Sequence, residues 1–143
     1  MSDRSTSAVL EELDTEECLR LISPGGVGRV GFNTPDGPTV LPVNYTMDGR
    51  AVLFRTAFGG PMDQDLSTGV RGVELKIAFE VDHIDTAAQQ GWSVLIQGAA
   101  HRVSEEELAT LSSPIAEPWA GGERRLYIRV DPVQLTGRRI RHE

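Results

Sequence analysis

The stretch VGRVGFNTPDGPTVLPVNYTMDGRAVLFRT, residues 27–56, decides the fold. It holds three runs of β-type residues separated by turn signals. The runs are Val27–Phe32, Thr39–Tyr45 and Ala51–Thr56. The turns contain TPDG at 34–37 and DG at 48–49, and glycine supplies the positive φ angles that tight hairpins need. The stretch therefore predicts an antiparallel meander of three strands.

Four further β-type runs follow the meander. They are Leu75–Val81, Trp92–Val103, Leu126–Val130 and Gln134–Ile140. Two helical segments interrupt them, one near Met62–Thr68 and one that begins at Ser104, where Ser104 and Glu107 predict a capping box. Short strands at regular spacing favour a closed barrel, because closure removes the strand edges that would otherwise aggregate. The predicted fold class is mainly β with flanking helices.

The N-terminal part is expected to be mobile and then helical. Residues 1–8 are small and polar, whereas Asp14 and Glu17 have the spacing of a capping box for a helix that ends near Ile22. The SPGG sequence at 23–26 ends that helix, because proline and glycine do not support a further turn. We therefore expect a flexible segment over residues 1–12 and a single domain over residues 13–143.

Composition narrows the classes of function. The net charge of −7 repels phosphates, so no nucleic-acid partner is expected, and the arginines at 138, 139 and 141 read as a solvated tail. Cys18 is the only cysteine, which excludes an intrachain disulfide and fits a reducing cytoplasm. No run of about 18 apolar residues occurs, so neither a membrane span nor a secretory signal is expected.

Several catalytic motifs are incomplete. Leu95 stands where a nucleophile elbow around Ser93 would need its second glycine, so Ser93 is not expected to act as a nucleophile. The three histidines lack metal-binding spacing, and the acidic run EVDHID at 80–85 reads as a strand end and polar turn rather than a cation site. Glycine-rich nucleotide loops are missing. We therefore assign no catalytic residue and no metal site.

One polar group at a strand end could bind an anion. Arg55, Thr56 and Ala57 end the strand AVLFRT, where a guanidinium, a hydroxyl and turning backbone amides could converge on a phosphate. The alternative is an ordinary surface arginine.

Five motifs in order carry a resemblance to a known family. They are PVNY at 42–45, VLFRTA at 52–57, FEVD at 79–82, GWSVLIQGAA at 91–100 and GRRI at 137–140. Together they resemble the pyridoxamine 5′-phosphate oxidase-like family of short bacterial flavin-binding proteins. The similarity runs from about Leu13 to Ile140. It implies a six-stranded split barrel that forms a homodimer, with FMN in clefts between the subunits.

The resemblance also implies roles for particular residues. Arg55 and Thr56 would contact the phosphate, with backbone donors at Ala57 beside them. Asn44 would lie near the isoalloxazine ring or the ribityl chain. Trp92 and Ser93 would line the same cleft, from either subunit.

Trp92 and the apolar strand Val94–Ile96 are expected at the dimer interface. The alternative for Trp92 is a core position within one barrel.

The implied activity is that of an FMN-dependent oxidoreductase whose substrate is not identified. Pro61 stands where relatives usually carry a lysine, and loss of one charged contact predicts phosphate binding weaker by about 1.5–3 kcal/mol. Lys76 and Arg71 are candidate replacements. The alternative function is a non-catalytic split-barrel ligand-binding or interaction protein with a weakened phosphate site. Deazaflavin, haem or no cofactor are the alternatives to FMN.

Overall fold

The computed structural model describes residues 7–56, 75–111 and 126–142. These ranges contain seven β-strands and two α-helices. In chain order they are β1 (Ala8–Leu13), α1 (Thr15–Ile22), β2 (Gly26–Thr34), β3 (Gly37–Asp48), β4 (Ala51–Thr56), β5 (Leu75–Asp85), β6 (Gln90–Arg102), α3 (Glu105–Thr110) and β7 (Leu126–His142).

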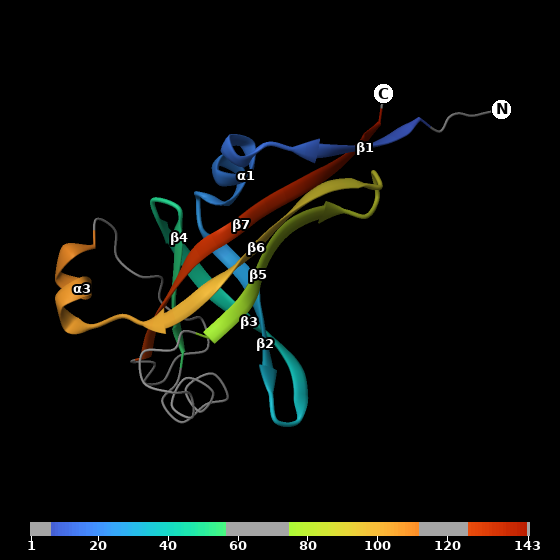
Figure 1. Cartoon of the computed structure of the whole chain (residues 1–143). Helices are drawn as coiled ribbons and strands as arrows, with labels where there is room; N and C mark the ends of the chain where they lie inside the picture. The colour runs from blue at the N-terminus through green and yellow to red at the C-terminus, as the bar shows by residue number, and fades with distance from the viewer. Residues whose placement is uncertain (1–6, 57–74, 112–125, 143) are drawn as a thin grey trace.

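Six of the strands close into a barrel (Figure 1). Pairing runs from β7 through β4, β3, β2 and β5 to β6, and β6 pairs again with β7. Every pairing is antiparallel. The predicted class, a mainly β barrel with flanking helices, is confirmed.

The predicted meander of β2, β3 and β4 is also confirmed. The β2–β3 hairpin closes at Thr34 opposite Gly37, and the β3–β4 hairpin closes at Asp48 opposite Ala51. Gly37 and Gly49 have φ angles of 119° and 60°, which residues with a side chain rarely adopt. The two turn glycines therefore set the register of the three strands.

The first strand was not expected from the sequence. Residues Ala8–Leu13 pair with the last part of β7, from Ala8 opposite His142 to Leu13 opposite Gly137. The expectation of a flexible segment through residue 12 is wrong from Ala8 onward, because the backbone of β1 pairs with the backbone of β7. Glu11 adds ion pairs to Arg139 and Arg141, at 3.6 and 3.5 Å. These arginines were expected to form a solvated tail, and that expectation is corrected for both.

Strand β7 is one long strand, where the sequence indicated two. Gln97 of β6 lies opposite Gln134 and Gly98 lies opposite Pro132, so Val133 is an extra residue in β7. This is a bulge, one of the few places where a strand accepts proline. The acidic run at 80–85 likewise belongs to β5 up to Asp85, rather than to a turn.

Both predicted helix starts are present. Ser104 caps α3 with a complete capping box with Glu107. At α1, Asp14 Oδ1 accepts a hydrogen bond from the Glu17 amide at 2.8 Å, whereas the Glu17 carboxylate accepts bonds from Arg20 and Arg139. Those bonds lower the pKa of Glu17 to about 2. The helix predicted near Met62–Thr68 lies outside the described residues.

Helix α1 contributes to the barrel core. Cys18 and Ile22 are fully buried, and the Tyr45 hydroxyl donates a hydrogen bond of 2.9 Å to the Ile22 carbonyl. Burial raises the pKa of Tyr45 to about 12. The rings of Tyr45 and Phe54 both pack on Phe79, with centroids 5.3 and 5.9 Å apart. Among the described residues, no helix is long and apolar enough to cross a membrane.

Candidate functional site

Asn44 and Arg55 each lie one residue beyond the last β3–β4 pair, on the outer face of the barrel. Tyr45 of β3 is directly opposite Phe54 of β4, and both side chains are buried in the core. Asn44 precedes Tyr45 and Arg55 follows Phe54, so both point to the other face, because successive side chains in a strand alternate. Both are partly buried.

Tyr127 continues this row on β7. It is the direct cross-strand partner of Arg55, and the Arg55 guanidinium carbon lies 5.7 Å from the centre of the Tyr127 ring. Nη2 of Arg55 is buried. The structure therefore groups Asn44, Arg55 and Tyr127 across three neighbouring strands. Tyr127 was missed in the sequence, where nothing marks a lone tyrosine in an apolar run as a contact of Arg55.

The other residues of the predicted phosphate group are placed only in part. Thr56 ends β4 opposite Leu126 and is partly buried. It follows Arg55 directly in the strand, so its side chain points to the opposite face. Ala57, Pro61 and Arg71 lie outside the described residues. Lys76 is exposed in a separate cavity of about 600 Å³, which also contains Gln97 and Val133.

Trp92 and Ser93 lie on β6, opposite Arg139 and Arg138 of β7. Trp92 is partly buried and packs against the core, so the core interpretation holds for part of its side chain. Trp92 and Ser93 also border a cavity of about 660 Å³. Its further lining includes Leu10, Ile84, Arg138 and Ile140.

The predicted interface role of Val94–Ile96 is wrong for two of its residues. Val94 and Ile96 are 1% and 0% exposed, since they point into the core of their own barrel. Leu95, between them, is the residue of this stretch that points outward.

One chain does not bring Arg55 and Trp92 together. On β7, Tyr127 is the partner of Arg55, and Arg139 is the partner of Trp92. Tyr127 and Arg139 are twelve positions apart on this strand. At 3.3 Å per residue the separation along the strand is on the order of 30 Å or more. The five predicted cofactor residues that the structure describes therefore divide into two groups at opposite ends of the barrel, with Asn44, Arg55 and Thr56 in one and Trp92 and Ser93 in the other.

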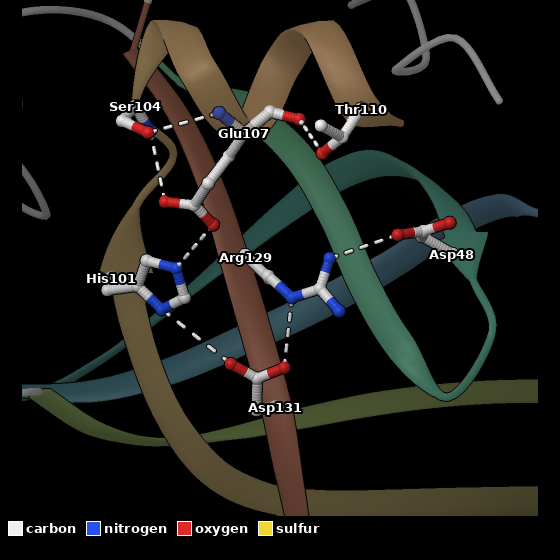
Figure 2. Close-up of polar contacts among 7 residues, drawn as sticks. All are labelled: Asp48, His101, Ser104, Glu107, Thr110, Arg129 and Asp131. Atoms are coloured by element: carbon white, nitrogen blue, oxygen red, sulfur yellow. Dashed lines mark hydrogen bonds and ion pairs between the residues drawn. The ribbon is translucent and has the colours of Figure 1, made fainter. Parts of the chain in front are cut away.

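Figure 2 shows a polar network around Arg129. Arg129, two residues after Tyr127 on β7, donates to Asp48 of β3 at 3.0 Å and to Asp131 at 2.9 Å. Burial works against the charge of Arg129, but these bonds outweigh it and raise its pKa above the ordinary value. The network ties β7 to the end of β3.

His101 extends this network to α3. Its Nε2 lies 3.1 Å from Glu107 and its Nδ1 lies 3.7 Å from Asp131. The hydrogen bond with His101 lowers the pKa of Glu107. In the sequence, the Ser104 capping box was the one signal that involved a residue of this network, Glu107. The contacts of His101 could not be predicted, because its partners come from different elements.

A second charged cluster lies on β2 and β5. Arg29 Nη1 is 3.3 Å from Glu80 and 3.5 Å from Asp82. Burial and the neighbouring Asp82 carboxylate raise the pKa of Glu80 to about 7. The residues that the structure describes contain no group of three or more histidine, cysteine or carboxylate side chains that could hold a metal ion.

The ring of six antiparallel strands with α1 at one end defines a split β-barrel. The sequence profile of the family described as pyridoxamine 5′-phosphate oxidase matches residues 14–139. The chain belongs to this family.

Known relatives agree with this assignment. An uncharacterised protein of Mycobacterium tuberculosis is 32% identical over 133 residues, which cover 90% of this chain and 84% of the relative. A FAD-binding protein of Mycobacterium smegmatis has a similar structure, with 29% identity, a TM-score of 0.66 and coverage of 93% of this chain and 100% of that one. A Corynebacterium glutamicum structure provisionally named a pyridoxamine 5′-phosphate oxidase shares 27% identity at a TM-score of 0.74, over 94% of this chain and 95% of that one.

Proposed function

We propose that this protein is a flavin-dependent oxidoreductase that holds FMN in a cleft between two copies of the chain. The observation that carries the proposal is the partly buried row of Asn44, Arg55 and Tyr127 in a member of this family. The FAD-binding protein of M. smegmatis, similar over 93% of this chain, supports a flavin as the ligand.

The residues at the end of β4 fit the phosphate end of a flavin nucleotide. Arg55 is partly buried, and a charge-assisted hydrogen bond from arginine to phosphate is stronger away from bulk water. The Thr56 side chain points to the opposite face of β4, so the next donor in sequence that could join Arg55 is the backbone amide of Ala57. Asn44 can both donate and accept, which suits the ribityl hydroxyls or the edge of the isoalloxazine ring.

Trp92 and Ser93 would come from the second copy. Their partners on β7 lie too far from Tyr127, the β7 partner of Arg55, for both groups to reach the same flavin within one chain. Leu10, Ile84 and Ile140 around the Trp92 cavity are 59%, 59% and 43% exposed, an apolar surface that a second copy would cover. Twofold association is the commonest solution for small soluble proteins.

A bound flavin supplies the redox chemistry of its ring system. The residues of this chain would bind the phosphate, orient the ring and keep water out of the cleft. We assign no side chain as a catalytic acid or base. The residues that the structure describes do not identify a substrate, so vitamin B6 oxidation is not part of the proposal. We further propose a cytoplasmic location, which the single cysteine supports.

The test begins with protein purified without added ligand. We expect flavin absorbance in the visible spectrum, or saturable binding on titration with FMN, FAD and a deazaflavin, with FMN the tightest. Tighter binding of FAD or of the deazaflavin would mean that this ligand, and not FMN, is the cofactor. If the protein shows no flavin absorbance and no saturable binding at micromolar concentrations, the proposal that it is a flavin-dependent enzyme is refuted.

The second candidate function is a non-catalytic ligand-binding or interaction protein, and Pro61 favours it. A proline at the position where relatives usually carry lysine removes a cation from the phosphate segment. Pro61→Lys distinguishes the two functions. A gain in FMN affinity of ten- to a hundredfold would mean that the pocket persists but lacks a cation.

A further inference from the structure

The cavity of about 600 Å³ that contains Lys76, here called the Lys76 cavity, has a floor of small residues. Gly31 of β2 is the direct partner of Ala78 of β5, and Ala99 of β6 lies opposite Lys76. Ala78 points outward, because its neighbour Phe79 is fully buried in the core and side chains alternate along a strand. No side chain of this floor extends beyond Cβ, which leaves room for a flat ligand to lie on the sheet.

Two exposed valines stand on opposite sides of this floor. Val40 of β3 pairs with Gly31 and is 65% exposed, whereas Val133 of β7 is 82% exposed. Val133 is the extra residue of the bulge in β7, and bulges often lie beside functional sites, where they redirect a side chain. Gly98 permits this bulge, since a Cβ atom on it would collide with the Asp131 carbonyl oxygen. The cavity therefore has apolar walls, as small-molecule sites usually do.

Lys76 brings a positive charge to this cavity, and it makes no hydrogen bond or ion pair with any other residue that the structure describes. It is also the one basic residue among the described residues that line the cavity. The side chains of Asn33, Gln97 and Gln134 line the same cavity and make no hydrogen bond within the described part of the chain. Each amide can donate and accept hydrogen bonds, whereas lysine only donates. The cavity thus combines one cation with amides that a ligand can use.

We propose that the Lys76 cavity is a second ligand site, which binds a flat organic monoanion of the aromatic carboxylate class. Its volume lies within the range of small-molecule sites, and the open floor between valine walls suits an apolar ring. One ammonium group matches one carboxylate better than a doubly charged phosphate. None of the five predicted cofactor residues that the structure describes lines this cavity, so the inference does not rest on the proposed function.

The test compares 2-naphthoate with its neutral analogue 2-naphthamide by isothermal titration calorimetry of the purified protein. We expect saturable binding of 2-naphthoate below about 1 mM, and binding of 2-naphthamide weaker by about three- to tenfold. Lys76→Met should weaken 2-naphthoate binding by this factor and leave 2-naphthamide binding unchanged. Arg138→Met removes a cation that lines the Trp92 cavity, and as the matched control it should change neither. The proposal is wrong if 2-naphthoate does not bind, or if its binding depends on Arg138 and not on Lys76.

The position of the bound ring is tested separately. Ala78→Leu fills the floor and should abolish binding of both compounds, with urea unfolding to check that the variant folds. In the wild type, the backbone amide signals of Ala78 and Ala99 should shift in NMR spectra on titration with 2-naphthoate, whereas that of Gly91, which lines the Trp92 cavity, should not. Binding that persists in a folded Ala78→Leu variant would overturn the proposal, as would shifts at Gly91 without shifts at Ala78.

A competition experiment separates the two sites. Saturating FMN should leave the affinity for 2-naphthoate unchanged, because the Lys76 cavity is distinct from the residues predicted to hold the flavin. Displacement of 2-naphthoate by FMN would assign it to the flavin cleft and overturn the second site. A protein that binds 2-naphthoate at Lys76 but no flavin would support this inference and refute the proposed function.

Discussion

Gly137 of β7 faces Cys18 of α1 so closely that a Cβ atom on Gly137 would lie 2.6 Å from the cysteine sulfur. The same Cβ would be 3.1 Å from the Ser93 carbonyl oxygen and 3.3 Å from Cγ2 of Val94. Cys18 is fully buried, so its sulfur cannot turn toward solvent. The missing side chain at position 137 is what lets α1 pack against β6 and β7.

Gly137→Ala should therefore lower the free energy of unfolding by about 1–3 kcal/mol, as overpacked cores do. Gly31→Ala is the matched control, because its nearest neighbours would lie 3.9 Å away, an ordinary contact. Urea unfolding followed by circular dichroism measures both. Adding Cys18→Ala to Gly137→Ala should recover part of the loss. Similar losses for the two glycine variants would contradict the steric explanation.

Glu80→Gln should change how stability depends on pH. The folded-state pKa of Glu80 is raised to about 7, so its contribution to stability is complete below its ordinary pKa near 4.5 and is lost as the pH rises toward 7. Glutamine cannot ionise and avoids this loss. We expect equal urea midpoints for variant and wild type at pH 4.5, and a variant more stable at pH 8 by on the order of 1 kcal/mol after solvent screening. Parallel pH profiles would count against the raised pKa.

Arg129→Met should destabilise the protein by about 1–3 kcal/mol, because it leaves the partly buried Asp48 and Asp131 carboxylates without this donor. Arg20→Met is the control. Its ion pair with Glu17 is on the surface, where such pairs contribute little to stability. Thermal unfolding compares the two. A change in melting temperature no larger for Arg129 than for Arg20 would show that the network in Figure 2 does not stabilise the fold.

Arg55→Leu should weaken FMN binding by about ten- to a hundredfold, the effect of losing one charged hydrogen-bond donor to phosphate. Lys76→Leu removes a cation that lines a different cavity and should leave affinity unchanged. Fluorescence quenching of FMN measures both. The reverse pattern would move the phosphate site from the end of β4 to the Lys76 cavity.

The protein should have twice its chain mass of 15.6 kDa in light scattering at micromolar concentration. Ile84→Asp, which puts a charge beside the Trp92 cavity, should produce a folded monomer, whereas Val40→Asp on β3 should not. A wild-type mass near 15.6 kDa would contradict the dimer, and with it the proposal of a flavin cleft shared by two copies. A dimer unaffected by Ile84→Asp would place the interface elsewhere.

Local signals in the sequence were sufficient for most of the secondary structure. The turns at Gly37 and Gly49, the cap at Ser104 and the alternation in β2–β4 all act over a few residues, so they can be read without knowing the fold. Strand β1 was missed because AVLEEL has no turn signal, and its pairing with β7 depends on residues more than a hundred positions away. The bulge at Val133 was missed because it depends on the register between β6 and β7.

The candidate site divides along the same line. The sequence by itself determined that Arg55 and Thr56 end a strand next to a turn, that Asn44 precedes a core tyrosine, and that the chain resembles a flavin-binding family. Only the tertiary structure decided that Asn44 and Arg55 share one outer face with Tyr127, and that Trp92 lies at the far end of the barrel. The physical reason is that the sequence of a strand determines which of its side chains share a face. The neighbours of that strand in the closed sheet are set by pairings between distant parts of the chain, and these pairings determine the contacts of each side chain.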